Sequence, residues 1–230
     1  MRGYIYIYIY NIHKNIKEVL EQYGYPFKSK EHSKKLYEYK KFQNENREPG
    51  RWLKKYFNMS ESNYRTCPKS LMYQIEKDFT LNISDMCCTK LKKESIKDYM
   101  KQNGKSITMT GMMRAEGGQR MNIPCIVTAK DNTIKKFHPM APLNEDWEKW
   151  FIETRKIKLC DLYYPPYNFD RTGCKGCPFN PDLQEQLDKM EYLLPNEKKQ
   201  CEIIWKPVYD EYRRIGYRLR KYDEDKLFDW

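Results

Sequence analysis

The pattern of apolar and polar residues predicts a strand followed by a helix at the start of the chain. After Gly3, tyrosine and isoleucine alternate strictly to Tyr10, which is typical of a strand with one kind of side chain on each face. Residues 13–23 carry apolar side chains at helical spacing, and we expect this helix to end at Gly24 and Pro26. Its apolar residues are Ile16, Val19, Leu20 and Tyr23.

The segment of about residues 28–80 is predicted to be mainly helical at first. Helical stretches at about 29–43 and 51–57 are broken at Pro49-Gly50, and the composition is charged and aromatic. We interpret this segment as a helical insertion into an α/β core. A basic helical arm is the alternative.

The last fifty residues, 181–230, are predicted to form a helical C-terminal extension. Residues 182–194 and 196–220 both have amphipathic spacing, Pro195 separates them, and Asn196 is available as a cap. The sequence therefore predicts two helices in this part of the chain.

β structure is expected in the middle of the chain. Residues 106–110 form a short β-prone run, and the runs 123–128 and 133–137 flank Asp131-Asn132, which predicts a hairpin. A helix over residues 146–157 follows, with Trp147, Trp150 and Phe151 on one side. We expect Trp147, Trp150 and Trp205 to lie in the core because they fall at helical core spacing.

Composition and charge restrict the class of protein. The chain has 230 residues, enough for one sizeable core with an appendage, and it contains no apolar run long enough to span a membrane and no export signal. Its eight cysteines are therefore expected in a reducing cytoplasm, as thiols or metal ligands. The 43 Lys and Arg against 32 Asp and Glu give a net charge of +11, which favours anionic partners or reflects a solvated basic surface.

A pair of adjacent cysteines and a distant CxxC motif provide the most specific chemistry. Cys87-Cys88 begins a predicted helix that Ser84 or Asp85 can cap and that continues to about Met100, and the second pair is Cys174 and Cys177. Four thiolates can hold an iron–sulfur cluster or zinc. Adjacent side chains diverge and so reach two irons of a cubane more easily than two corners of a zinc tetrahedron. The alternative is that these are small buried thiols.

A glycine-containing loop with two arginines follows the predicted strand at 106–110. The loop reads GMMRAEGGQR, so that Arg114, Glu116 and Arg120 lie close together. Guanidinium groups and loop N–H groups both match sulfate or phosphate oxygens, and the loop is a candidate anion pocket. Exposed loop arginines are the alternative.

The remaining cysteines give weaker signals. Cys125 and Cys160 are expected to be packed thiols, Cys67 a loop thiol, and Cys201 a half-buried thiol within a helix. The three histidines show no ligand spacing, and catalytic histidine chemistry is not expected.

The order of these motifs resembles the phosphoadenosine phosphosulfate reductase family. The sequence has the adjacent cysteines, then GxxRxExxxR, then P-x-x-P-L before the tryptophan helix, then RTGCKGCPF. It is most similar to the iron–sulfur, adenylylsulfate reductase-like branch over about residues 13–180. The resemblance implies an α/β, adenine-nucleotide α-hydrolase-like (PP-loop) core over residues 1–180, before the helical extension at 181–230.

The resemblance also implies roles for individual residues. The four cysteines match those that hold a 4Fe–4S cluster, with zinc as the alternative metal. Lys92 matches a lysine between cluster and substrate, Arg114 and Arg120 match residues that face the phosphosulfate, and Glu116 takes the place of a polar partner. Arg171 matches a further basic residue beside the cluster. The implied ligand is adenylylsulfate, phosphoadenylylsulfate or an ATP-like nucleotide.

Two departures from the family bear on activity. No serine-glycine-glycine-lysine PP-loop occurs, and residues 17–26 match a part of the family that follows this loop, so we expect an incomplete, N-terminally truncated core. The C-terminal thiol, Cys201, lacks the Glu-Cys-Gly-Leu-His context of the family nucleophile. We expect a protein of sulfur reduction or sulfur transfer that is inactive or takes its PP-loop from a partner chain.

A hypothesis from another class stays open. In it, the chain is a non-catalytic, metal-stapled module that binds nucleic acid or protein, and its basic C-terminal residues contact a nucleic-acid backbone. Those residues are Arg213, Arg214, Arg218, Arg220 and Lys221.

Overall fold

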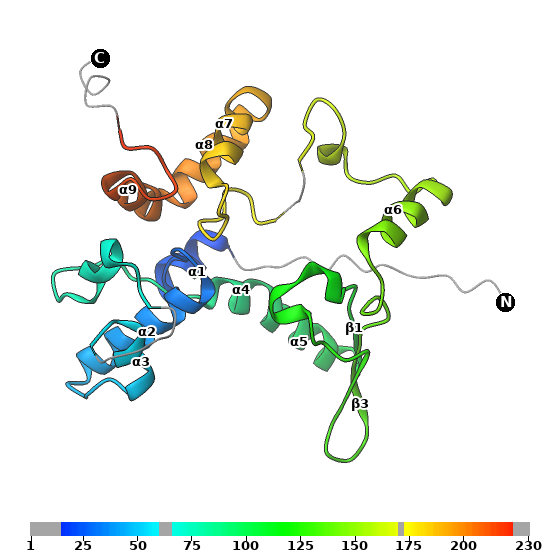
Figure 1. Ribbon diagram of the computed structural model, residues 1–230, viewed down its shortest axis with the longest axis horizontal. Coiled ribbons are helices and arrows are strands. Elements are labelled where there is room, and N and C mark those ends of the chain that lie inside the picture. Colours follow the sequence, from blue (N-terminus) through cyan, green and yellow to red (C-terminus); the bar gives the residue numbers. More distant parts are fainter. Residues whose placement is uncertain (1–14, 60–65, 170–172, 223–230) are drawn as a thin grey trace. The chain divides into compact units, whose positions relative to one another are not determined.

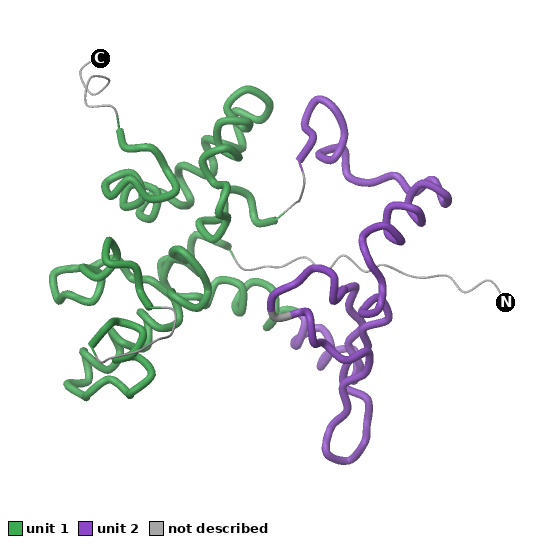
Figure 2. Tube along the Cα trace, viewed as in Figure 1, with its two compact units in different colours: residues 1–95, 171–230 green, residues 96–170 purple. Residues whose placement is uncertain are grey.

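The computed structural model describes residues 15–59, 66–169 and 173–222, except for the side chain of Gln119 (Figure 1). The predicted strand at residues 3–10 and the predicted site residue Arg171 lie outside the described residues. The chain divides into two compact units, which are coloured separately in Figure 2. Unit 1 contains residues 1–95 and 171–230, and unit 2 contains residues 96–170.

The N-terminal part of unit 1 is helical, as predicted. Asn15 caps the first helix by accepting a hydrogen bond from the Lys17 N–H at 2.9 Å, and Ser29 caps the second by accepting from the His32 N–H at 3.2 Å. Gly24 ends the first helix at φ +96°, where a Cβ atom would lie 2.9 Å from Asn82. The elements are α1 (Ile16–Tyr23), α2 (Lys30–Asn44), α3 (Arg51–Tyr56) and the 3-10 helix η1 (Lys69–Ile75).

The helix that carries the first cysteine pair is interrupted by a π turn. It consists of α4 (Met86–Cys88), the π-helical η2 (Thr89–Lys93) and α5 (Glu94–Gln102). Of the two predicted caps, the Ser84 hydroxyl accepts a hydrogen bond from the Met86 N–H at 3.2 Å, whereas Asp85 makes no side-chain cap. Single π turns inside helices are frequent at functional sites.

The C-terminal part of unit 1 contains three helices, so the predicted single helix over 196–220 is wrong. The helices are α7 (Leu183–Leu193), α8 (Pro195–Ile204) and α9 (Lys206–Ile215). Pro207 lacks an N–H and its ring clashes with a helical carbonyl four residues earlier, so α8 cannot continue through it and ends at Ile204, with Trp205 between α8 and α9. Pro195 begins α8, so Asn196 lies inside the first turn and is not the cap. Gly216, at φ +64°, ends α9.

A buried polar cluster connects three of the helical segments in unit 1. His32 is completely buried, and its Nε2 donates a hydrogen bond to the Gln74 amide oxygen at 2.7 Å. Its Nδ1 is 2.9 Å from the Tyr56 hydroxyl and 3.9 Å from the Cys67 sulfur. Burial lowers the pKa of His32 to about 4 and raises the pKa of Cys67 to about 11. The cluster is therefore a neutral, packed core feature.

Unit 2 contains a small mixed sheet of three strands. β1 (Thr108–Met109), β2 (Ile126–Thr128) and β3 (Ile134–Phe137) lie in the order β1-β3-β2, with β1 parallel and β2 antiparallel to β3. The predicted hairpin is confirmed, and Asp131 stabilises its turn by accepting a hydrogen bond from the Thr133 N–H at 3.1 Å. Together with the helices, this sheet gives the chain the mixed α/β character that the sequence predicts.

The aromatic helix of unit 2 is less buried than predicted. In α6 (Glu145–Thr154), Trp147 is half-buried and stacks on Phe151 at 5.0 Å, while Trp150 is 54% exposed. The core prediction is wrong for Trp150 because the aromatic side chains of α6 pack mainly on one another. Cys160, predicted to be packed, is exposed.

None of the helices described is long and apolar enough to cross a membrane.

We predict that His32 makes the stability of the protein depend on pH. Because the folded-state pKa of about 4 is below the ordinary value of 6.5, the unfolded chain binds more protons between these values. The free energy of unfolding should therefore rise by up to about 3 kcal/mol as the pH rises from 4 to 6.5. Urea melts across this range should show the slope, and His32→Gln should flatten it. An unchanged slope in the variant would contradict the assignment.

Candidate functional site

The first cysteine pair lies at the start of the π-interrupted helix, among lysines. Cys87 is 5% exposed and Cys88 is half-buried. The Cys87 thiol donates a hydrogen bond to the Cys88 sulfur, which raises the pKa of Cys87 and lowers the pKa of Cys88. Lys30, Lys92 and Lys93 lower the pKa of Cys88 further. Cys88 is therefore the thiol of this pair that is favoured as a thiolate.

The second cysteine pair lies in a tight turn. The Cys177 N–H donates a hydrogen bond to the Cys174 carbonyl at 3.1 Å, and Gly176 between them adopts φ +59°. Burial, together with the neighbouring thiols Cys174 and Cys88, raises the pKa of Cys177 to about 11.

The tertiary structure brings the two pairs and Lys92 together within unit 1. Cys177 interacts electrostatically with both Cys87 and Cys88, across 85 or more residues of sequence. Lys92 interacts with Cys174, Cys88 and Cys177, and the largest cause of its raised pKa is the charge on Cys174. Among the described residues, the four predicted cysteine ligands and Lys92, a predicted substrate-binding residue, are therefore neighbours.

The chemistry of this donor set fits a cysteine-ligated metal centre. All four groups are thiols, as an iron–sulfur cluster or a structural zinc site requires. The lysines around them offset the negative charge of thiolates. Within the described ranges, no three His, Cys, Asp or Glu side chains converge on a point that could hold a single metal ion. The ligand role of the cysteines stays a prediction.

Side chains of the C-terminal helices hold the CxxC turn. We define the cysteine turn as residues 174–178. Buried Trp205 and Tyr209 donate hydrogen bonds to the carbonyls of Lys175 and Gly176 at 2.9 and 2.5 Å. Tyr212 and Arg218 both donate to the Pro178 carbonyl, at 2.9 and 2.6 Å. A Cβ atom on Gly176 would lie 2.5 Å from the Tyr209 hydroxyl and 2.8 Å from the Cys201 sulfur.

Sequence reasoning missed these contacts. Trp205, Tyr209 and Tyr212 recur at helical spacing, which signals a buried face, but the pattern does not indicate which segment the face covers. Cys201 was expected to be a half-buried helix thiol; it is 1% exposed within α8, and burial raises its pKa to about 11.

In unit 2, the predicted anion-binding arginines have partners within their own loop. The Arg114 Nε donates to the Ile123 carbonyl at 2.9 Å, and its Nη2 lies 3.9 Å from the Cys125 sulfur. Arg120 forms an ion pair with Glu116, whose carboxylate also accepts a hydrogen bond from the Met113 N–H at 2.9 Å. Both ion-pair partners are partly exposed, so the pair is worth about 0–1 kcal/mol and leaves Arg120 available for exchange to an anion.

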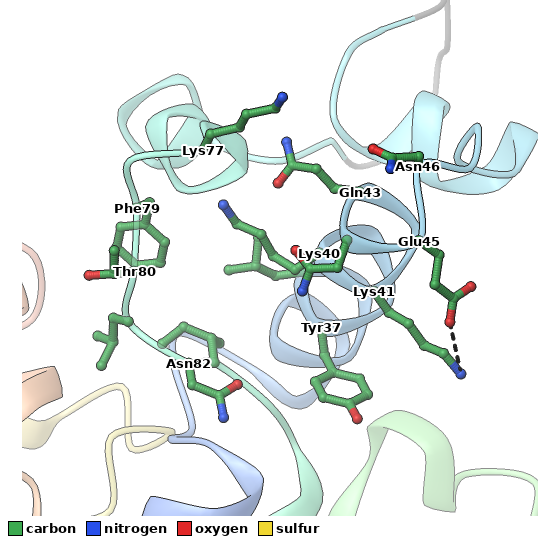
Figure 3. Close-up of a pocket in the computed structure, with 14 residues that line it drawn as sticks. Tyr37, Lys40, Lys41, Gln43, Glu45, Asn46, Lys77, Phe79, Thr80 and Asn82 are labelled. Carbon is green, nitrogen blue, oxygen red and sulfur yellow. Dashed lines mark ion pairs between the residues drawn. The ribbon is translucent and has the colours of Figure 1, made fainter.

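Unit 1 also contains an open groove of about 870 Å³ between α2 and the segment 77–83 (Figure 3). None of the predicted site residues lines this groove. Two of the lysines that line it have local partners: Lys40 donates to the Glu76 carbonyl, and Lys41 pairs with Glu45 at 3.9 Å.

A family model, the phosphoadenosine phosphosulfate reductase domain, matches residues 5–180 of the chain. No curated protein and no solved structure gives a significant match. The family match covers more than half of the chain and includes both cysteine pairs, Lys92 and the arginine loop.

We predict that Gly176→Ala destabilises the protein by about 2–4 kcal/mol, because alanine is strained at positive φ and its Cβ would overlap Tyr209 and Cys201. Thermal and urea melts measure this loss. The matched control is Gly173→Ala, since a Cβ at Gly173 meets no atom within 4 Å. Equal effects of the two substitutions would contradict the tight packing at Gly176.

Proposed function

The chain belongs to the phosphoadenosine phosphosulfate reductase family, and on that premise we propose that it is an oxidoreductase-like protein of sulfur metabolism that binds a sulfonucleotide beside a cysteine-ligated 4Fe–4S cluster. The family binds sulfonucleotides such as phosphoadenylylsulfate or adenylylsulfate. The observation that carries the proposal is the position of Lys92 among the thiols of Cys88, Cys174 and Cys177.

Cys87, Cys88, Cys174 and Cys177 would hold the cluster. Iron–sulfur clusters supply electron transfer at a potential set by nearby hydrogen bonds, charge and solvent exposure. Zinc, with the same donors, is the alternative metal, but it supplies no electrons.

The chain's own cations would bind and orient the substrate. Lys92 is exposed to solvent and interacts electrostatically with the thiols, so its ammonium group is placed to pair with a sulfate or phosphate oxygen next to the metal centre. In unit 2, Arg114 and Arg120 are proposed anion-binding residues, because their guanidinium groups carry further donors beyond those used by Ile123 and Glu116.

The non-catalytic, nucleic-acid-binding alternative gains no support from the C-terminal arginines. Arg213 pairs with Glu202 at 2.6 Å, Arg214 with Glu211 at 2.7 Å, and Arg220 with Asp188. Arg218 binds the cysteine turn through Pro178. A partner chain that supplies a PP-loop stays a prediction. We also propose a reducing cytoplasmic setting, in which cysteines stay available as metal ligands.

The cofactor is tested by metal and sulfide analysis of the full chain after anaerobic purification and reconstitution. We expect iron and acid-labile sulfide in equal amounts, with visible absorption that is lost in Cys88→Ser and Cys177→Ser. Cys160→Ser is the matched control because Cys160 is exposed in unit 2. Uptake of zinc without sulfide would refute the cluster.

The role of Lys92 is tested by adenylylsulfate binding, measured by titration calorimetry. Lys92→Gln should weaken binding about tenfold or more, since a hydrogen bond to a charged group is lost. The cluster content should stay unchanged. Lys90→Gln is the control, because Lys90 lies two residues away and pairs with Glu94 at 2.7 Å. Equal affinities of wild type and Lys92→Gln would exclude Lys92 from the substrate site.

A further inference from the structure

The Tyr212 hydroxyl joins two segments that are distant in sequence. Tyr212 lies in α9 and is completely buried. Its hydroxyl accepts a hydrogen bond from the Lys28 N–H at 2.7 Å and donates one to the Pro178 carbonyl at 2.9 Å. Its ring also packs edge-on against Phe27, with the ring centroids 4.5 Å apart. One side chain therefore holds the α1–α2 connection and the end of the cysteine turn.

From the α1–α2 connection, backbone hydrogen bonds lead to the first cysteine pair. The Tyr25 N–H donates to the Asn82 carbonyl at 2.8 Å, and the Ser84 N–H donates to the Tyr25 carbonyl at 2.9 Å. Ser84 is buried, and its hydroxyl caps the helix that begins at Met86, directly before Cys87. These hydrogen bonds fix the start of the helix that carries the first cysteine pair relative to Tyr25.

At the other end, the cysteine turn depends on the C-terminal helices for its hydrogen bonds. The carbonyls of Lys175, Gly176 and Pro178 accept from Trp205, Tyr209 and Tyr212, in that order. A buried carbonyl without a donor is costly, so these side chains select one conformation of the turn. The side chains come from α9 and the residue before it.

We propose that Tyr212 is a positioning residue for the four thiols of the candidate site, and that α9 holds the two cysteine pairs in place. We call this role of α9 the clamp. Tyr212 hydrogen-bonds directly to Pro178, at the end of the cysteine turn, and to Lys28. Lys28 lies in the α1–α2 connection, whose Tyr25 pairs with Asn82 and Ser84 just before the Cys87-Cys88 pair, so Tyr212 fixes the distance between the two pairs through this connection. Tyr209 supports the same turn from one helical turn away. This inference rests on the proposed role of the four thiols, and it makes the C-terminal helices a part of the site.

The test is the alkylation rate of each cysteine in the full chain with metal removed by chelation, followed by mass spectrometry of peptides. Tyr212→Phe keeps the ring and removes both hydrogen bonds. Alkylation of Cys174 and Cys177 should accelerate about threefold to tenfold, because each opening of the turn costs one hydrogen bond less. Tyr209→Phe should give a similar acceleration. Exposed Cys160, in unit 2, serves as the internal reference.

The control variant is Tyr192→Phe, because Tyr192 is 84% exposed on α7 and its hydroxyl loss should leave every rate unchanged. Unchanged rates at Cys174 and Cys177 in both folded test variants would overturn the inference. So would a uniform acceleration that includes buried Cys67, since that result would indicate general loss of stability. The iron and sulfide analysis of the wild type fails or succeeds independently of these rates, so the two proposals can be distinguished.

When the wild type and the same variants are loaded with the cluster, the rate of cluster loss provides a second readout. Tyr212→Phe should lose its visible absorption several-fold faster under chelator challenge than wild type or Tyr192→Phe. Equal loss rates would show that the clamp does not reach the metal centre.

Discussion

The hydrogen-bonding requirement of the buried cysteine turn organises unit 1. Within the turn, the Cys177 N–H satisfies the Cys174 carbonyl, whereas the carbonyls of Lys175, Gly176 and Pro178 take their donors from side chains elsewhere in the chain. Trp205, Tyr209 and Tyr212 supply them from the C-terminal helices. Because the Tyr212 hydroxyl also accepts from the Lys28 N–H, the N-terminal and C-terminal helices of the unit meet at this side chain. The absence of a side chain at Gly176 allows the close approach.

Electrostatics distinguish the two candidate anion-binding regions. Around the thiols, exposed lysines from α2 and the π turn lower the pKa of the half-buried Cys88. In the arginine loop, by contrast, Arg120 is neutralised by Glu116 at the surface. The first region therefore has cations next to the thiols, whereas in the second an anion would compete with Glu116 for part of the Arg120 guanidinium group.

Local structure was largely predictable, and the errors have physical causes. The caps at Asn15 and Ser29 and the hairpin turn at Asp131 use side-chain-to-backbone hydrogen bonds over two or three residues, which the sequence displays directly. The exposure of Trp150 was not predictable, because helical spacing shows that a face exists but not whether another element covers it. The break at Trp205 follows from Pro207, which cannot continue α8 and lies inside the range 196–220 that amphipathic spacing alone predicts as one helix.

The residue types at the candidate site and the family to which the chain belongs can be recognised from the amino-acid order alone. Four cysteines, Lys92 and the arginine loop were identifiable because metal ligands and anion-binding groups have characteristic residue types and spacings. Only the tertiary structure decided which segments surround them. The pairing of α9 with the cysteine turn involves contacts across more than 30 residues, and the Tyr212 link to Lys28 spans 184. Such contacts depend on how buried faces combine in three dimensions, which no local pattern encodes.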